Sequence, residues 1–156
     1  MKKLLLRDKV CVWITSIFGI GYSPFFPGTL ACVVAVFIFI LIKNSSSFVV
    51  FTAISVVVSF LLSSRAEKIF NEKDSKKIVI DDFAGMLITM LFIPHTPQFI
   101  FCGFFLFRAL DMIKIPPADK IEKYHGALGV VGDDVVAGIY ANIILHLVRG
   151  ILAIIA

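Results

Sequence analysis

The sequence predicts an all-α protein: a polytopic membrane helical bundle of about five spanning helices, preceded by a short N-terminal interfacial segment. Hydrophobic residues make up 59% of the 156 residues and charged residues only 17%. Soluble domains are nearer half apolar and a quarter charged. The mean hydropathy is +0.97. A small soluble domain keeps much of its surface exposed and could not hide this much apolar area. The length suits one domain spanning residues 1–156.

Apolar runs mark the expected helices. A crossing helix needs about 20 residues, with about 17 as a lower limit. Several of the runs reach that length only with their polar flanks, so their charged ends should lie near the membrane surface. The first run should lie at the interface, and the N-terminus lacks a small-residue cleavage pattern and should be retained. The runs cover residues 10–20, 30–42, 48–62, 83–93, 99–110 and 135–156.

Charge is segregated along the chain. If the N-terminus is cytoplasmic, the inside segments are 1–28, 63–82 and 108–134, and they hold every basic residue except Lys43 and Arg149. This is the positive-inside pattern. All 11 acids lie in the same segments, although acids contribute little to orientation. We therefore expect an active face on the cytoplasmic side. The net charge of +4 suits an anionic lipid surface, and no basic stripe with interleaved aromatics predicts nucleic-acid binding.

The stretch 19–29, which combines glycines, prolines, a serine and a threonine, comes just before an expected spanning helix. Helix starts carry unpaired N–H groups and positive dipole character, so they can hold a phosphate. The substrate-binding candidates here are Ser23, Gly28 and Thr29. The alternative is an ordinary loop with Thr29 as the N-cap.

Acids precede or interrupt three further apolar runs. Asp81 and Asp82 start one run, with Glu67 and Asp74 shortly before it. One acid of the pair could ligate a metal while the other caps the helix. Two capping acids are the alternative.

A second cluster combines both signs of charge. Arg108 and Asp111 are three residues apart and share a helix face, with Lys114 close by. Such a stripe could bind phosphate and metal together. The alternative is an intrahelical ion pair.

A glycine-bearing loop then delivers Asp133 and Asp134 to the last helix, followed by Gly138 and Ala141 at helical spacing. Small residues allow close packing of membrane helices. This packing would draw the two acids toward Asp82 and Asp111. Helix capping is again the alternative.

Clustered carboxylates suit Mg²⁺, which can polarise a phosphoryl oxygen and activate water. The residues alone therefore indicate metal-assisted chemistry on an anionic lipid headgroup at the membrane.

The ordered motifs resemble the phosphatidylglycerophosphatase A family over about residues 12 to 145. The matching pieces are residues 21–29, 66–67 with 74, 78–86, 107–114 and 132–138. The resemblance implies an Mg²⁺-dependent phosphatase of the bacterial inner membrane that converts phosphatidylglycerol phosphate to phosphatidylglycerol. The motif positions are Thr29, Glu67, Asp74, Asp82, Arg108, Asp111, Lys114, Asp133 and Asp134.

From the motifs and the residues together we predict three roles. The catalytic set is Asp82, Arg108, Asp111, Asp133 and Asp134. The metal ligands are Asp82, Asp133 and Asp134, then Glu67 and Asp74. Arg108 and Lys114 would hold the phosphate, with metal-activated water as the preferred nucleophile and an aspartyl-phosphate as the alternative.

The sequence departs from the family pattern. Asp82 stands where the family usually has Glu, and Ala31-Cys32 stands where Gly-Ser is usual. Three rival functions therefore stay open: a phosphatase of another lipid monophosphate such as phosphatidic acid, an inactive lipid-binding relative, and a small transporter. Acids gathered on one side argue against the transporter. The sequence does not indicate an oligomeric state.

Overall fold

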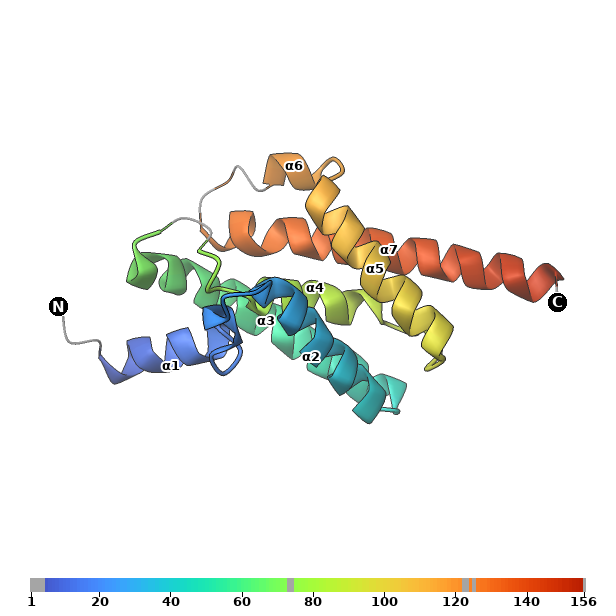
Figure 1. Ribbon diagram of the computed structural model, residues 1–156, viewed down its shortest axis with the longest axis horizontal. Coiled ribbons are helices and arrows are strands. Elements are labelled where there is room, and N and C mark those ends of the chain that lie inside the picture. The colour runs from blue at the N-terminus through green and yellow to red at the C-terminus, as the bar shows by residue number, and fades with distance from the viewer. Residues whose placement is uncertain (1–4, 73–74, 122–123, 125, 156) are drawn as a thin grey trace.

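The computed structural model describes residues 5–72, 75–121, 124 and 126–155. Its helices are α1 (Leu6–Thr15), the 3₁₀ helix η1 (Ile20–Tyr22), α2 (Pro27–Leu41), α3 (Ser45–Phe70), α4 (Ile80–Thr89), α5 (Pro97–Ile113), α6 (Ala118–Ile121) and α7 (Ala127–Ile155). The described residues contain no strand. The predicted all-α class is confirmed, and each long apolar run forms a helix (Figure 1).

Local signals in the sequence set several helix ends. Pro27 begins α2 and Pro97 begins α5, where the missing N–H group costs nothing. Asn44 caps α3, because its side chain accepts a hydrogen bond from Ser47 N at 2.9 Å. Helix α5 ends at Ile113, and the next residue, Lys114, has a φ of 50°. A left-handed residue of this kind stops a helix and turns the chain away.

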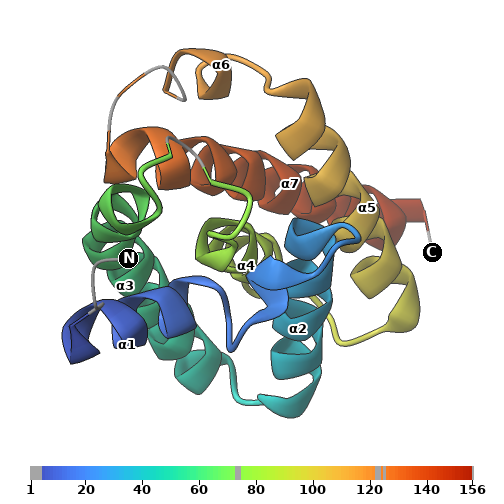
Figure 2. The ribbon, with the colours of Figure 1, turned by 60° about the vertical axis from the view of Figure 1, so that its left-hand side comes forward.

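Helix α4 lies at the centre of the bundle and is almost wholly buried. It contacts α2, α3, α5 and α7, and Figure 2 shows it surrounded by them. The helix ends after 10 residues, so at 1.5 Å per residue it is about 15 Å long, about half the hydrocarbon thickness. The run predicted over 83–93 is therefore not a full spanning helix. Its continuation is a turn over residues 90–92, in which Met90 is buried and Phe92 is exposed.

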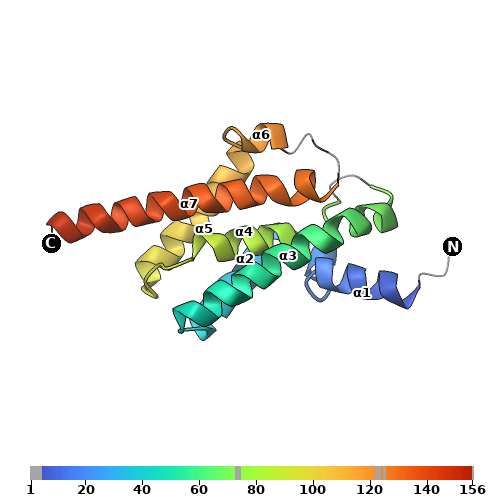
Figure 3. The ribbon, with the colours of Figure 1, turned by 180° about the vertical axis from the view of Figure 1, so that it is seen from behind.

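Two helices, α3 and α7, are long and apolar enough to cross a membrane. Only 17% of the apolar window in each is buried inside the protein, so most of their side chains face outward. Figure 3 shows both running along the length of the molecule. With 15 residues in α2 and 17 in α5, a count of five spanning helices is not confirmed. The outward apolar faces are those of a membrane protein.

Candidate active site

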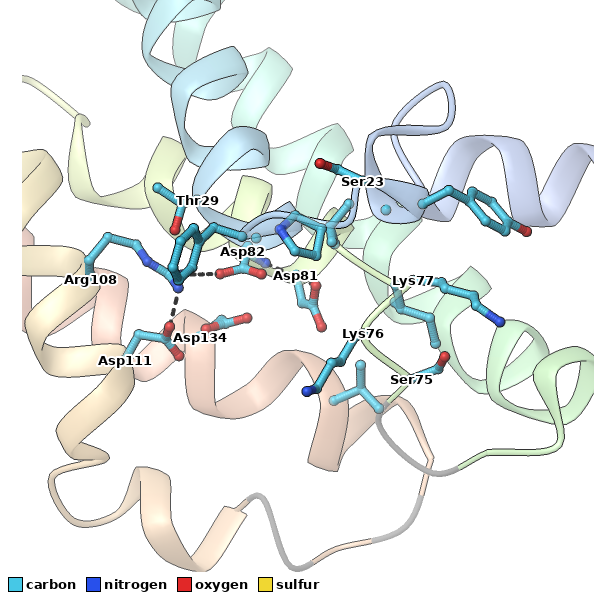
Figure 4. A pocket seen from close by; sticks show the side chains of 18 of the residues that line it. Ser23, Thr29, Ser75, Lys76, Lys77, Asp81, Asp82, Arg108, Asp111 and Asp134 are labelled. Atoms are coloured by element: carbon cyan, nitrogen blue, oxygen red, sulfur yellow. Dashed lines mark hydrogen bonds and ion pairs between the residues drawn. The ribbon is translucent and has the colours of Figure 1, made fainter.

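One pocket collects residues from four separate motifs. It has a volume of about 680 Å³, and we call it the acidic pocket. The N-terminal ends of α2 and α4, the C-terminal end of α5 and the first turns of α7 surround it (Figure 4). Its charged and hydroxyl side chains are Tyr22, Ser23, Thr29, Ser75, Lys76, Lys77, Asp81, Asp82, Arg108, Asp111, Lys114, Asp133 and Asp134.

Three carboxylates meet inside this pocket. One oxygen from each of Asp81, Asp82 and Asp134 lies within 4.8 Å of the others. Asp81 is 5% exposed and Asp134 is 6% exposed. Asp134 Oδ1 is buried without a hydrogen-bond partner among the described residues. A buried carboxylate oxygen that lacks a donor is costly unless a cation satisfies it, so these residues fit a hard metal ion.

Two glycines bring the three carboxylates together. Gly85 of α4 and Gly138 of α7 face each other where the helices cross, and a Cβ at Gly138 would lie 2.5 Å from the Gly85 carbonyl oxygen. A Cβ at Gly85 would lie 2.7 Å from the backbone oxygen of Asp134. The helices can therefore touch only through glycine. This confirms the predicted close packing, which places Asp134 beside the start of α4.

Helix α2 approaches the same carboxylates through Gly28. The position that a Cβ would take at Gly28 is already occupied by the Asp82 carboxylate. The first turn of α2 therefore reaches the acidic pocket, and Thr29 lies at its wall beside Arg108 (Figure 4). A helix start of this kind supplies positive dipole character and N–H donors to an anion.

Arg108 links two of the predicted catalytic acids. Its Nη1 pairs with Asp82 Oδ1 and lies 2.9 Å from Asp111 Oδ2. The spacing of three residues did predict that Arg108 and Asp111 share a helix face. The sequence did not reveal the contact with Asp82.

Lys114 and Asp133 form a second pair at the pocket wall. Lys114 Nζ lies 2.9 Å from Asp133 Oδ2, and Asp133 Oδ1 is buried without a hydrogen-bond partner in the described part of the chain. Asp133 is adjacent to Asp134 but is not one of the three clustered carboxylates. The structure brings together Asp82 and Asp134 as predicted, with Asp81 in the place that the sequence suggested for Asp133.

The other predicted positions differ in their outcome. Ser23 lies on the pocket wall, where its Oγ donates to Phe25 O at 3.1 Å. Glu67, on α3, does not line the acidic pocket. Asp74 lies outside the described residues.

Sequence reasoning missed Asp81 as a member of the cluster and Lys76 as part of the wall. The signal was present, because Asp81 directly precedes Asp82. However, residues about 100° apart on a helix are not expected to serve one site. Lys77 Nζ lies 5.2 Å from the Phe70 ring centroid and points away from the carboxylates in Figure 4. Lys76 is therefore the better candidate for meeting an anion.

Residues 13–149 of the chain match the family model described as phosphatidylglycerophosphatase A. An Escherichia coli protein named phosphatidylglycerophosphatase A is 34% identical over 84% of this chain and 78% of its own length. Its Haemophilus influenzae namesake is 31% identical over 96% of this chain and 94% of its own length.

A Bacteroides thetaiotaomicron protein carrying a provisional phosphatidylinositol-3-phosphatase name is 31% identical, over 86% of this chain and 91% of its own length. No solved structure matches.

Proposed function

This chain belongs to the phosphatidylglycerophosphatase A family and is a lipid phosphatase, and we propose that it hydrolyses phosphatidylglycerol phosphate to phosphatidylglycerol and phosphate with the help of Mg²⁺. The observation that carries the proposal is the meeting of Asp81, Asp82 and Asp134 beside Arg108 in one pocket. A terminal phosphate monoester bears up to two negative charges. It therefore needs the cations that this pocket combines.

Asp81, Asp82 and Asp134 would hold the Mg²⁺. Oxygen ligands from carboxylates are those that this ion prefers, and the buried Asp134 Oδ1 lacks a hydrogen-bond partner among the described residues. When bound, the ion supplies Lewis-acid stabilisation of charge on the phosphoryl oxygens and lowers the pKa of water. Glu67, Asp74 and Asp133 stay predictions as further ligands.

The chain's own cations would bind and orient the phosphate. Arg108 presents a planar fork of donors that matches phosphate oxygens, and Asp111, 2.9 Å from it, holds that fork in position. Lys114 and Lys76 add charge at the pocket wall, and the first turn of α2 adds N–H donors near Thr29. Phosphoryl transfer depends mainly on such positioning and charge stabilisation.

The nucleophile is either water or one of the clustered carboxylates. The two routes differ in where oxygen from the solvent appears when the aspartyl-phosphate is hydrolysed at its acyl carbon; hydrolysis at phosphorus would label the phosphate on both routes. In a single turnover in ¹⁸O water, direct attack by water puts the label in the first phosphate released. Attack by a carboxylate that is later hydrolysed at its acyl carbon leaves that phosphate unlabelled. We favour attack by water.

We place the acidic pocket at the cytoplasmic face of the bacterial inner membrane, with five passages of the chain. A second pocket, at the opposite ends of the same helices, is lined by residues near 42–48, 92–95 and 149. Residues lining the two pockets alternate along the chain, which supports passages by α2, α3, α4 with its following turn, α5 and α7. The basic residues gather on the acidic-pocket side.

Phosphate release by the purified protein in detergent micelles tests the proposed activity. Phosphatidylglycerol phosphate, phosphatidic acid and phosphatidylinositol 3-phosphate would be compared in Mg²⁺ and in EDTA. We expect Mg²⁺-dependent release, fastest from phosphatidylglycerol phosphate. Faster release from phosphatidylinositol 3-phosphate would support the second candidate, which rests on the Bacteroides relative.

Two variants make this experiment specific to the site. Asp134→Asn keeps the size of the side chain but removes its charge from the carboxylate cluster, so release should fall to background. Asp8→Asn is the matched control, because Asp8 pairs with Arg65 at 2.7 Å outside the acidic pocket. Equal activity of the wild type and Asp134→Asn would refute the role of the cluster.

A further inference from the structure

The two basic residues that break the positive-inside pattern come together in one pocket. Lys43 follows α2 and Arg149 lies near the end of α7, yet both line a pocket of about 370 Å³. We call it the basic pocket. Its lining residues come from the C-terminal end of α2, the start of α3, the connection from α4 to α5 and the C-terminal part of α7. Residues more than a hundred positions apart therefore supply its two charges.

No acid balances these two charges locally. Segments 29–62, 83–107 and 135–156 contain no Asp or Glu, and these segments supply all the residues that line the basic pocket. Lys43 and Arg149 are both exposed. Among the described residues they form no ion pair with a carboxylate. The basic pocket thus presents positive charge to whatever ligand enters it.

The pocket is also built to keep its shape. His95 stacks on Phe39 with ring centroids 4.0 Å apart, and His95 Nε2 lies 3.0 Å from Phe39 O. Arg149 Nη1 donates to Phe92 O at 3.2 Å. This bond holds the guanidinium at the pocket while leaving its other N–H groups to meet a ligand. Asn44 caps the start of α3 at the same place.

An apolar groove begins where the basic pocket ends. The two share Ile42, and the groove continues for a volume of about 470 Å³ along α3, past Val50, Phe51 and Ile54. Val50 is 58% exposed and Ile54 is 57% exposed. These positions lie on successive turns of one face of α3, a helix long and apolar enough to cross a membrane. A charged head site therefore leads directly into a groove that fits an acyl chain.

We propose that the basic pocket and this groove together bind an anionic glycerophospholipid of the membrane leaflet opposite the acidic pocket. Lys43 and Arg149 take the phosphate of the headgroup, and Ile42 with the face of α3 from Ser46 to Ile54 takes one acyl chain. The bound lipid packs against α2, α3 and α7 at the end of the bundle where the protein itself supplies no acid. It is not the lipid being hydrolysed.

Quenching of a tryptophan by lipids with brominated acyl chains tests this site in the full-length protein. Trp13 is the only tryptophan, so Trp13→Phe gives a silent background. Ile54→Trp reports from the groove. Leu61→Trp, at a position on the same helix that is 70% exposed and outside the groove, is the matched control. Brominated phosphatidylglycerol and brominated phosphatidylcholine are then compared in reconstituted vesicles.

At the Ile54→Trp reporter, we expect phosphatidylglycerol to be preferred over phosphatidylcholine by about fivefold for each basic side chain. At the Leu61→Trp reporter we expect almost no preference. The double variant that combines Lys43→Gln and Arg149→Gln should abolish the preference for the anionic lipid. The single variant Arg149→Lys should retain most of it. Lys68→Gln, which removes one charge from the far end of α3, should leave it unchanged. All these variants should keep phosphate release, which shows that they are folded.

Three results would overturn the proposal. Equal preference at the two reporters would mean that the groove binds no particular lipid. An equal loss with Lys68→Gln would mean a general effect of charge. Displacement of the brominated lipid by millimolar inorganic phosphate or glycerol phosphate would make the basic pocket a site for soluble anions instead.

Discussion

Replacing Gly138 with alanine is expected to push α7 away from α4 and separate the carboxylates of the acidic pocket. The new Cβ would lie 2.5 Å from Gly85 O and 3.2 Å from Gly85 C and Cα. Ordinary contact begins at 3.4 Å, so the shortfall at the oxygen is about 0.9 Å. All three atoms belong to the backbone, and no side-chain rotation can relieve the contact. The helices themselves must therefore move.

This movement should lower activity, because the acidic pocket tolerates little displacement of its carboxylates. Asp134 is one helical turn before Gly138, and Asp81 is one turn before Gly85. Metal–ligand distances hold to about 0.2 Å, and a misplacement of about 1 Å can cost about 10²-fold in rate. We therefore expect kcat/KM for phosphate release to fall about 10²-fold, with weaker Mg²⁺ activation. Overpacking should also destabilise the fold by about 1–3 kcal/mol.

The assay compares Gly138→Ala with Gly150→Ala across a range of Mg²⁺ concentrations, after circular dichroism confirms the helices of each variant. Gly150 lies on the same helix with nothing within 4 Å of its Cβ position. Its replacement should leave activity unchanged and favour the helix by up to about 1 kcal/mol. Wild-type kcat/KM and Mg²⁺ activation in a folded Gly138→Ala protein would refute the role assigned to this helix crossing.

Three further predictions concern single side chains. Asp81→Asn should weaken Mg²⁺ binding at least about tenfold, and an unchanged Kd by calorimetry would remove Asp81 from the ligand set. Arg108→Lys keeps the charge but loses the planar guanidinium whose Nη1 contacts both Asp82 and Asp111, so kcat/KM should fall by about 10²-fold; near-normal activity would mean that charge alone suffices. Ser64→Ala removes the acceptor 2.7 Å from Ala127 N, so thermal denaturation should show a loss of about 1 kcal/mol. Ser59→Ala, whose buried hydroxyl has no hydrogen-bond partner among the described residues, should show a smaller loss.

Composition and charge order were sufficient to predict an all-α membrane protein, because both follow from the solvent that each segment meets. The same signals predicted that the charged residues gather at one end of the bundle, where the acidic pocket lies. The pairing of Arg108 with Asp111 was also predictable, because helical spacing alone places two residues three apart on one face. Gly138 was recognised as a contact position for the same kind of reason.

The length of α4 was not predictable from its apolar run. The run over 83–93 continues past the last helical residue, Thr89, and hydropathy does not distinguish a helix from an apolar turn. Burial among four neighbouring helices is what allows this short helix to pass through the bundle. Hydropathy therefore gave the number of apolar runs but not the number of full spanning helices.

What the sequence by itself determined was the inventory of charged residues and the face on which they gather. Only the tertiary structure decided which acids meet: Asp81, Asp82 and Asp134 cluster, while Asp133 pairs with Lys114. Distances between helices depend on how closely their backbones approach. That approach is set by facing pairs such as Gly85 and Gly138, and such pairs exist only once two distant segments have packed together.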